Sequence, residues 1–403
     1  MKILNINNYH YVRGGSDRHY LDLGELLTER GNAVVYFSSK SPENEARMGS
    51  YFVKSVNTQK PRMNDVARFL YSWEARKKIK ELIRKEKPNI GHLHIYYSQL
   101  TSSILEPIKK ARIPLVQTLH EYKLICPVAT LISHGKICEE CRGKYFWKVA
   151  IKTCNRNSFS RSFLNLLETH IARLNGAIKF IDHFIAPSEF LREKMIQYGV
   201  DGTKISTLPN FINVENYSSS VETGEYFVFL GRLEKIKGVF TFLEAAQRLP
   251  QPLFLIIGRG EAENEIVNWI HERKLRNVRL LGFKNREETG KIIQKAICVV
   301  VPSLWYENCP ISILEAFAMA RPVVGSNIGG IPELIEHGKD GFWVNPGDAD
   351  SLAEKLRWLD ANRAEAVRMG LNARKKAEEK YSPPFYYSKL MEIYDDVLKL
   401  NPL

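Results

Sequence analysis

The chain has 403 residues, of which 44% are hydrophobic and 26% are charged. These values are ordinary for a globular protein, and the length predicts two domains rather than one. No apolar run approaches the length needed to span a bilayer, and residues 1–7 have the pattern of a strand rather than of a signal peptide. The composition therefore excludes an integral membrane protein and predicts a cytoplasmic location.

The net charge of +13 comes from one half of the chain. Residues 1–200 contain 32 lysines and arginines against 18 aspartates and glutamates, whereas the remainder is nearly neutral. A basic face suits nucleic acid, an anionic membrane surface or an anionic substrate, and a merely soluble basic surface explains the charge equally well. Because the sequence has no recognised nucleic-acid-binding motif, we expect no nucleic-acid partner.

Strand-like and helix-like segments alternate in the first half, which predicts a doubly wound parallel sheet. Gly14 and Gly15 follow the first strand and allow close backbone approach to a phosphate, although a plain turn is an equally good interpretation. His120 lies just past a later strand end, where position alone favours a structural histidine. The expected strands lie near residues 3–7, 33–37, 90–96, 115–119 and 183–186.

Four of the six cysteines fall within 29 residues, at Cys126, Cys138, Cys141 and Cys154. A C-x-x-C pair with two further cysteines nearby is typical of a tetrahedral structural zinc site, in which His134 is an alternative ligand. A reducing cytosol argues against disulfides, and four free thiols are the other interpretation. The sequence thus predicts a structural zinc ion or a set of free thiols.

Two basic segments are candidates for contact with an anionic membrane surface. Residues 67–87 predict one basic helix, and residues 142–161 interleave cations with aromatic side chains. Such mixtures suit the bilayer interface, and a solvated helix face is the competing interpretation. The side chains expected to contact lipid are Arg76, Lys77, Lys78, Lys80, Arg84 and Lys85 in the first segment, and Lys144, Tyr145, Phe146, Trp147, Lys148, Lys152 and Arg156 in the second.

The alternation pauses near residues 208–211 and at Ser218–Ser220, which we predict to be a linker. It resumes with strands at residues 226–230, 253–257 and 278–281. The first of these strands is followed by Arg232 and Lys237, which at a strand end and helix entry can hold a diphosphate from two sides. A surface loop is the alternative interpretation. Asp348 and Asp350 precede a helical pattern, so capping explains them better than metal binding.

The stretch from Ile297 to Ala320 organises this half. A buried strand, a loop and a helix start meet there, and Pro310 suits the beginning of the helix. Glu307 in the loop and Glu315 on the helix can accept hydrogen bonds from two hydroxyl clusters of one polyol ligand. Alternatively, Glu307 caps a helix and Glu315 is a solvated surface charge. A second strand at residues 322–325 and the motif Gly-Gly-Ile-Pro-Glu at 329–333 follow.

This stretch resembles the retaining glycosyltransferases of family 4. That family has, in the same order, a Pro-Ser pair, two glutamates separated by seven residues and a Gly-Gly-x-Pro-Glu motif. The resemblance covers nearly the whole chain. It implies the GT-B fold: α/β, with two facing Rossmann-like domains, an interdomain cleft and a C-terminal helix that returns to the first domain. We expect an acceptor domain at 1–208 with a cysteine-rich insertion near 126–154, a nucleotide-sugar domain at 209–382 and the returning helix at 383–403. The family's diglycine loop is usually followed by glutamate, whereas this chain has Asp17.

The resemblance also implies a reaction. A sugar would pass from a UDP- or GDP-sugar donor to an acceptor hydroxyl. The basic first half favours a lipid-linked acceptor such as a polyprenyl-diphosphate-linked glycan, and because basic residues supply the charge at the diphosphate, we expect no metal or other cofactor in catalysis. Arg232 and Lys237 would stabilise the leaving phosphate, Glu315 would hold the ribose, and Glu307 and His120 would contact the sugar. Alternatives are a nucleotide-sugar epimerase on the same fold and a basic nucleic-acid-binding protein. The expected donor-binding residues are Gly14, Gly15, Arg232, Lys237, Arg259, Phe283, Asn308, Cys309, Pro310, Ile311 and Glu315.

Overall fold

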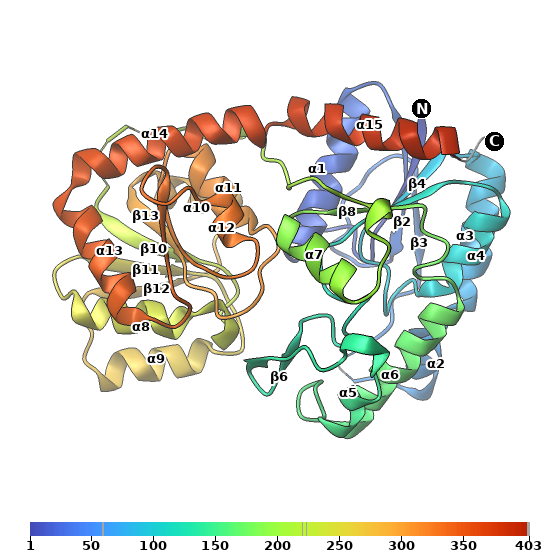
Figure 1. Ribbon diagram of the computed structural model, residues 1–403, viewed down its shortest axis with the longest axis horizontal. Helices are drawn as coiled ribbons and strands as arrows, with labels where there is room; N and C mark the ends of the chain where they lie inside the picture. The colour runs from blue at the N-terminus through green and yellow to red at the C-terminus, as the bar shows by residue number, and fades with distance from the viewer. Residues whose placement is uncertain (59, 220, 223, 401–403) are drawn as a thin grey trace. The chain divides into compact units, whose positions relative to one another are not determined.

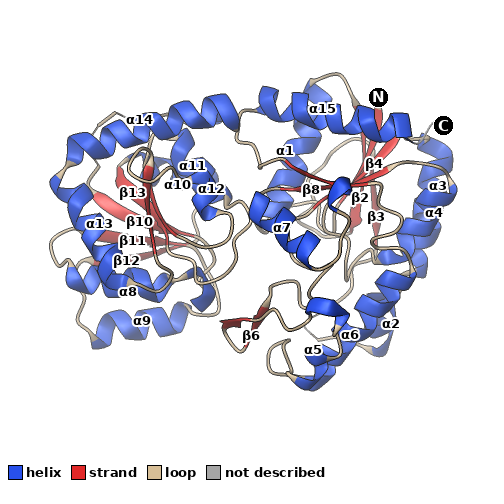
Figure 2. Ribbon diagram, viewed as in Figure 1, coloured by secondary structure: helices blue, strands red, loops and turns tan. Residues whose placement is uncertain are grey.

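The computed structural model describes residues 1–403 except 59, 220, 223 and 401–403. The chain divides into two compact units, the first formed by Met1–Pro209 with the segment that begins at Tyr387, and the second by Asn210–Tyr386. Each unit is built around its own parallel sheet, with helices connecting successive strands (Figures 1 and 2). Of the predicted linker, Ser220 lies outside the described residues.

The first unit contains a seven-stranded sheet with the strand order β3-β2-β1-β4-β5-β8-β9. All its paired strands run parallel, and the central ones are almost fully buried because helices cover both faces. The strands are β1 (Lys2–Ile6), β2 (Ala33–Ser39), β3 (Ser50–Val53), β4 (Ile90–Leu93), β5 (Leu115–Thr118), β8 (His183–Ala186) and β9 (Ile205–Thr207). The helices are α1 (Gly15–Glu29), α2 (Met63–Leu70), α3 (Trp73–Glu86), α4 (Leu105–Lys110), α5 (Lys148–Ile151), α6 (Phe159–Leu174) and α7 (Glu189–Gln197). The cysteine-rich segment forms an antiparallel hairpin of β6 (Ile132–Ser133) and β7 (Lys136–Ile137).

The second unit contains a six-stranded parallel sheet with the order β12-β11-β10-β13-β14-β15. Its strands are β10 (Tyr226–Leu230), β11 (Leu253–Ile257), β12 (Val278–Gly282), β13 (Ala296–Val301), β14 (Val323–Ser326) and β15 (Gly341–Val344). Its helices are α8 (Val239–Arg248), α9 (Glu263–Glu272), α10 (Arg286–Gln294), α11 (Ile311–Ala318), α12 (Ile331–Leu334), α13 (Ala349–Ala361) and α14 (Arg363–Lys380). Short 3-10 turns in the two units are η1 (Ser102–Ile104), η2 (Arg142–Lys144), η3 (Gly202–Lys204), η4 (Val214–Asn216) and η5 (Lys235–Lys237).

The central strand β13 shows why the second sheet forms. All six of its residues are buried, and four of them are β-branched, which favours a strand covered on both faces. Phe227, Phe242 and Phe254 pack together on one side of the sheet. Since the sheet is parallel, the loops that follow β10, β11, β12 and β13 emerge at one edge, where ligands bind in folds of this class.

The last helix, α15 (Pro383–Leu400), begins in the second unit and continues into the first. Its Tyr387 hydroxyl lies 3.1 Å from the Asn32 side-chain amide, and the Tyr394 hydroxyl lies 2.5 Å from Nδ1 of His92. These hydrogen bonds tie the end of the chain to the first sheet. Among the described residues, none of the helices combines the length and apolar character needed to cross a membrane.

Most expected strands are present within two or three residues of their predicted bounds, but β3, β6, β7, β9 and β15 were not predicted. The prediction of a single helix over residues 67–87 was wrong. The chain is extended at Tyr71, and the Ser72 hydroxyl accepts a hydrogen bond from the Ala75 N–H, so α3 begins as a separately capped helix. Capping by Asp348 is confirmed, because its carboxylate accepts from the Ser351 N–H at 2.9 Å.

Candidate active site

The loop after β10 is held against the loop after β13 by a glycine. Gly238 has a φ of 75°, and a Cβ atom on it would lie 1.7 Å from the Pro302 carbonyl oxygen, so no other residue fits without displacing the backbone. The Leu304 N–H donates to the Ile236 carbonyl at 2.8 Å. As a result, the η5 turn that carries Lys237 lies directly beside the loop that carries Glu307.

Glu307 is the centre of a buried hydrogen-bond cluster in this unit. Its Oε1 atom accepts from Lys237 Nζ at 2.7 Å, from the Ser303 hydroxyl at 2.8 Å and from the Trp305 indole N–H at 2.8 Å. The Lys237 ammonium also lies 4.9 Å from the centroid of the Trp305 ring, within cation–π range. We refer to Lys237, Ser303, Trp305 and Glu307 as the Glu307 cluster.

The charge state of Glu307 follows from these contacts. Burial works to raise the pKa of its carboxyl, but the Lys237 ammonium and the hydrogen bonds from Ser303 and Trp305 outweigh burial and hold the pKa below its usual range. Its backbone is fixed as well, since the Gly330 N–H donates to the Glu307 carbonyl at 2.7 Å. Gly329 approaches the same backbone with a φ of 61°. An ionised carboxylate is thus locked beside an ammonium group that keeps two N–H donors for other partners.

Helix α11 starts immediately after this loop. Pro310 is its N-cap rather than its first helical residue, and the helix has no side-chain cap, so its first backbone N–H groups are not used by a capping side chain. Asn308 and Pro310 are half-buried, whereas Cys309 is buried and its carbonyl accepts from the Asn210 side chain at 3.2 Å. The structure therefore assigns Cys309 a packing position in addition to its place beside the helix start.

Glu315 lies on α11, half-buried, and accepts a hydrogen bond from the Tyr217 hydroxyl at 3.2 Å. Tyr217 is itself buried beneath the guanidinium of Arg286, which lies 4.6 Å from its ring centroid. The second glutamate of the motif is therefore held separately from the Glu307 cluster. Two carboxylates on one loop and helix with different partners suit a ligand that has two hydroxyl-bearing parts.

The other predicted donor-binding residues of this unit lie at neighbouring strand ends. Arg232 follows β10, has a side chain that is 59% exposed, and pairs with Glu234 at 2.8 Å. Arg259 follows β11 and is exposed, and Phe283 follows β12 with 65% of its surface accessible. These residues are placed at the expected edge of the sheet, where their exposed groups are available to a ligand.

In the first unit, the diglycine loop is anchored by Asp17. This buried carboxylate accepts from the Asn7 side-chain amide at 2.9 Å and from the Arg13 N–H at 3.3 Å. Gly14 is extended, with open space around the position of a Cβ atom, and Gly15 is exposed. Asp17 therefore holds the loop to the end of β1, a role that the sequence left undetermined.

His120 belongs to a cluster of histidines at the carboxyl ends of β4 and β5. A hydrogen bond of 2.8 Å joins its Nε2 to Nδ1 of His94, and the two rings stack with centroids 5.1 Å apart. His92 stacks on His94 at 4.6 Å, and His19 lies 5.4 Å from His120. Burial lowers the pKa of His120 to about 3 and lowers that of His94, so both imidazoles are neutral at pH 7.

The predicted zinc site is not supported. Among the described residues, no group of three or more histidine, cysteine, aspartate and glutamate side chains could hold a metal ion. The sulfur of Cys126 is buried and accepts backbone N–H groups, and the Cys154 thiol donates to the Ser133 hydroxyl at 3.4 Å. Burial, followed by the neighbouring sulfurs of Cys126, Cys154 and Cys138, raises the pKa of Cys141 to about 12.

The chain matches known protein families and curated relatives. Residues 13–216 match the family described as Glycosyltransferase Family 4, and residues 213–376 match Glycosyl transferases group 1. The amylovoran biosynthesis glycosyltransferase AmsK of Erwinia amylovora is 32% identical over 222 residues, covering 52% of this chain and 54% of that protein. The UDP-Gal:alpha-D-GlcNAc-diphosphoundecaprenol alpha-1,3-galactosyltransferase of Escherichia coli is 29% identical over 220 residues, covering 49% and 56%. This chain spans about half the length of these two curated relatives that it matches.

The fold is found among solved structures. The Anabaena protein Alr3699/HepE in complex with UDP-glucose has a TM-score of 0.70 to this chain at 18% identity, covering 98% of this chain and 100% of that one. Two Rossmann-like units with parallel sheets are the GT-B fold, which confirms the predicted fold class. The match to Glycosyltransferase Family 4, at residues 13–216, alone covers more than half of the chain, so the chain belongs to glycosyltransferase family 4.

Proposed function

We propose that this chain transfers a sugar from a UDP- or GDP-sugar to an acceptor hydroxyl, with retention of configuration at the anomeric carbon. The observation that carries the proposal is the Glu307 cluster, in which a fixed ammonium group lies beside a buried carboxylate at the ligand-binding edge of the second sheet. The UDP-glucose bound by the Anabaena protein of the same fold supports a nucleotide-sugar donor.

Lys237 and Arg232 supply positive charge to the leaving diphosphate. One N–H of the Lys237 ammonium is directed to Glu307, which leaves the other two for phosphate oxygens, and the largely exposed guanidinium of Arg232 adds a planar fork. Preorganised cations at a departing phosphate lower the barrier by several kcal/mol, about a hundredfold or more in rate for one such contact. Since these side chains provide the charge, we propose that catalysis needs no divalent metal ion.

The remaining residues bind and orient the donor. Glu315 accepts hydrogen bonds from the ribose hydroxyls, Glu307 and the N–H groups at the start of α11 orient the sugar, and Phe283 lies against the base. His120 is a neutral hydrogen-bond partner for a sugar hydroxyl, because burial keeps it uncharged. The departing phosphate accepts the proton of the acceptor hydroxyl, so that no separate protein base is required for retention.

The acceptor that we propose is a lipid-linked glycan in the synthesis of a cell-surface polysaccharide. Its support is the Escherichia coli relative, whose acceptor is a diphosphoundecaprenol-linked sugar, and the Erwinia relative of amylovoran biosynthesis. The same proposal places the protein at the inner face of the membrane, where such an acceptor is found, and the excess of cations in residues 1–200 suits an anionic lipid surface.

A panel of UDP-, GDP-, ADP- and dTDP-sugars tests the donor site, because a ligand that binds only the folded protein raises its melting temperature. We expect one nucleotide class to stabilise the wild type and to lose its effect in Glu315→Ala. The matched control is Glu365→Ala, which removes a glutamate of α14 that pairs with Arg368 at the surface. Equal shifts in both variants would place the nucleotide elsewhere.

A further inference from the structure

Helix α6 is amphipathic in the reverse sense. Its buried positions include the polar residues Ser162, Glu168 and Thr169, whereas four of its six exposed positions are large and apolar, the other two being Ser160 and His170. The exposed apolar side chains are Phe159 (61% exposed), Phe163 (43%), Leu167 (37%) and Leu174 (85%). Spacings of four, four and seven residues put all four on one face of the helix. A soluble helix normally presents the opposite pattern.

The neighbouring helix α5, with its N-cap Trp147, adds further exposed apolar side chains next to α6. It packs against α6 (Figure 1), and its exposed apolar side chains are Trp147 (52%) and Ile151 (69%). We call Trp147, Ile151, Phe159, Phe163, Leu167 and Leu174 the α5–α6 apolar surface. Six large exposed apolar groups on two adjacent helices exceed the scattered singles of an ordinary protein surface, and such patches mark binding sites.

The segment that carries this surface is strongly basic. Residues 142–179 contain a single acidic side chain, Glu168, which turns inward and pairs with buried Lys123 at 2.6 Å. The segment contains eight basic residues: Arg142, Lys144, Lys148, Lys152, Arg156, Arg161, Arg173 and Lys179. Arg173 faces inward, with its guanidinium 4.5 Å from the Phe146 ring centroid, and Lys148 and Lys152 pair with Glu140, whereas Arg142, Lys144, Arg156 and Lys179 are exposed.

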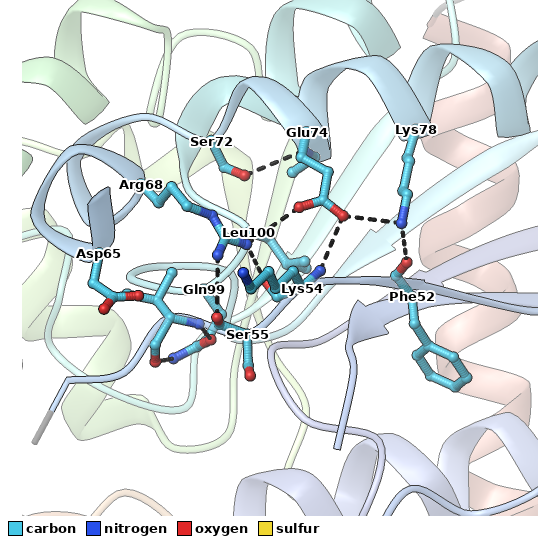
Figure 3. Close-up of polar contacts among 12 residues, drawn as sticks. Phe52, Lys54, Ser55, Asp65, Arg68, Ser72, Glu74, Lys78, Gln99 and Leu100 are labelled. Atoms are coloured by element: carbon cyan, nitrogen blue, oxygen red, sulfur yellow. Dashed lines mark hydrogen bonds and ion pairs between the residues drawn. The ribbon is translucent and has the colours of Figure 1, made fainter. Parts of the chain in front are cut away.

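The other basic segment, in α2 and α3, is organised differently. Figure 3 shows Glu74 between Arg68 and Lys78, which it pairs with at 3.2 and 2.9 Å, while Lys78 also donates to the Phe52 carbonyl at 2.8 Å. These cations fasten the two helices to β3, and Arg76 pairs with Glu106. Because Arg68, Arg76 and Lys78 are paired within the fold, this segment is the weaker candidate for anionic lipid.

We propose that the α5–α6 apolar surface lies in the interface of an anionic lipid bilayer, with α6 parallel to the membrane plane. The apolar side chains enter the boundary between headgroups and acyl chains, and the exposed cations meet lipid phosphates. A two-fold contact with a second copy is disfavoured, because it would bring the same cations of both chains together. The inference rests on the proposed function only in that a lipid-linked acceptor gives this contact a purpose.

Sedimentation with vesicles of phosphatidylcholine and phosphatidylglycerol measures the contact directly. We expect the wild type to bind at about 0.15 M salt and to retain part of its binding at about 1 M, because salt screens the ionic term and leaves the apolar term. The triple variant Phe159→Ser, Phe163→Ser, Leu167→Ser should partition at least about tenfold more weakly, since it removes three buried apolar groups from the lipid contact. Its melting temperature without vesicles should stay close to that of the wild type, because the three side chains are exposed.

The matched control is Val267→Ser, Leu371→Ser, Phe385→Ser, which removes three apolar side chains of similar exposure (49%, 46% and 39%) from other helices. It should bind vesicles like the wild type. Absence of vesicle binding, or equal binding by both triple variants, would overturn the proposal. A vesicle-free dimer that becomes monomeric in the first variant would overturn it in favour of a second copy. Nucleotide-sugar stabilisation, measured in the same variants without lipid, reports separately on the proposed function.

Discussion

Lys237 Nζ lies 2.7 Å from Glu307 Oε1, and both side chains are largely removed from solvent. A carboxylate in such a place depends on its cation. We expect Lys237→Met to lower the free energy of unfolding by about 3 kcal/mol, because it leaves the carboxylate buried and unpaired. In Lys237→Met/Glu307→Gln, much of that loss should be recovered. Urea unfolding of Lys237→Met, of Glu307→Gln and of the double variant measures this coupling, and additive losses would show that the pair is not coupled.

Lys237→Met and the double variant should each reduce turnover about a hundredfold.

Trp305 provides a second test of the same cluster. Its indole N–H donates to Glu307 at 2.8 Å, while its ring lies under the Lys237 ammonium. Trp305→Phe keeps the ring and removes the donor, so we expect turnover to fall about tenfold, in line with the loss of one charge-assisted hydrogen bond. Trp305→Ala removes both and should cost more. Equal turnover for Trp305→Phe and the wild type would mean that the indole N–H has no part in positioning Glu307.

His94 should control the orientation of His120 through their 2.8 Å hydrogen bond. An asparagine side chain can place a polar atom near the position of Nδ1, whereas phenylalanine fills the space without one. We therefore expect His94→Asn to retain most of the turnover and His94→Phe to lose at least about tenfold, at similar stability. The ¹⁵N shifts of labelled histidine give an independent check, because only the hydrogen-bonded pair locks one tautomer of His120. A similar loss in both variants would point to packing alone.

Glu121 should make stability depend on pH. Burial raises the pKa of its carboxyl from 4.5 to about 7, with Lys123 opposing the shift and Glu168 and Asp17 adding to it. The folded protein therefore holds this proton more tightly than the unfolded chain does. The contribution of Glu121 to the free energy of unfolding is thus fully present below pH 4.5 and is lost as the pH rises through 7. Because the side chain is half-buried, we expect Glu121→Gln to stabilise the protein by about 1 kcal/mol at pH 8 and to change little at pH 4.5. A larger gain at acidic pH would contradict the sign.

Two glycines give opposite expectations. Gly238→Ala should prevent normal folding of the second unit, because the new methyl group meets the Pro302 carbonyl oxygen at 1.7 Å and φ is positive. Gly14→Ala has open space and an extended backbone, so its melting temperature should match that of the wild type. Any effect of Gly14→Ala should then appear in turnover, through the approach of a ligand to the diglycine loop. Circular dichroism melts of both variants are the measurement.

The sequence predicts those elements whose burial is complete. The apolar runs of β10, β11 and β13 mark them plainly, because a strand covered on both faces has no polar alternation. The short edge strands β3 and β9 are partly exposed, and their mixed composition does not differ from that of a loop. The break between α2 and α3 depends on a capping serine within a strongly helical pattern, so composition alone hides it.

For the site, the sequence supplied the residues and not their partnerships. Lys237 and Glu307 are 70 residues apart, and their contact depends on the close approach at Gly238, which no local pattern reveals. Ser303 and Trp305 were missed as partners of Glu307, although their positions four and two residues before it were a usable signal. His94 directly follows β4, and only the pairing of β4 with β5 brings it to His120.

The most direct test of the central claim is release of nucleotide from the stabilising nucleotide-sugar, measured with and without a polyprenyl-diphosphate-linked glycan acceptor. We predict release that requires the acceptor, persists in EDTA, yields a product with the donor's anomeric configuration, and falls about a hundredfold in Lys237→Met. Conversion of the donor without acceptor would instead indicate an epimerase. Turnover that is unchanged in Lys237→Met would contradict the role of the Glu307 cluster.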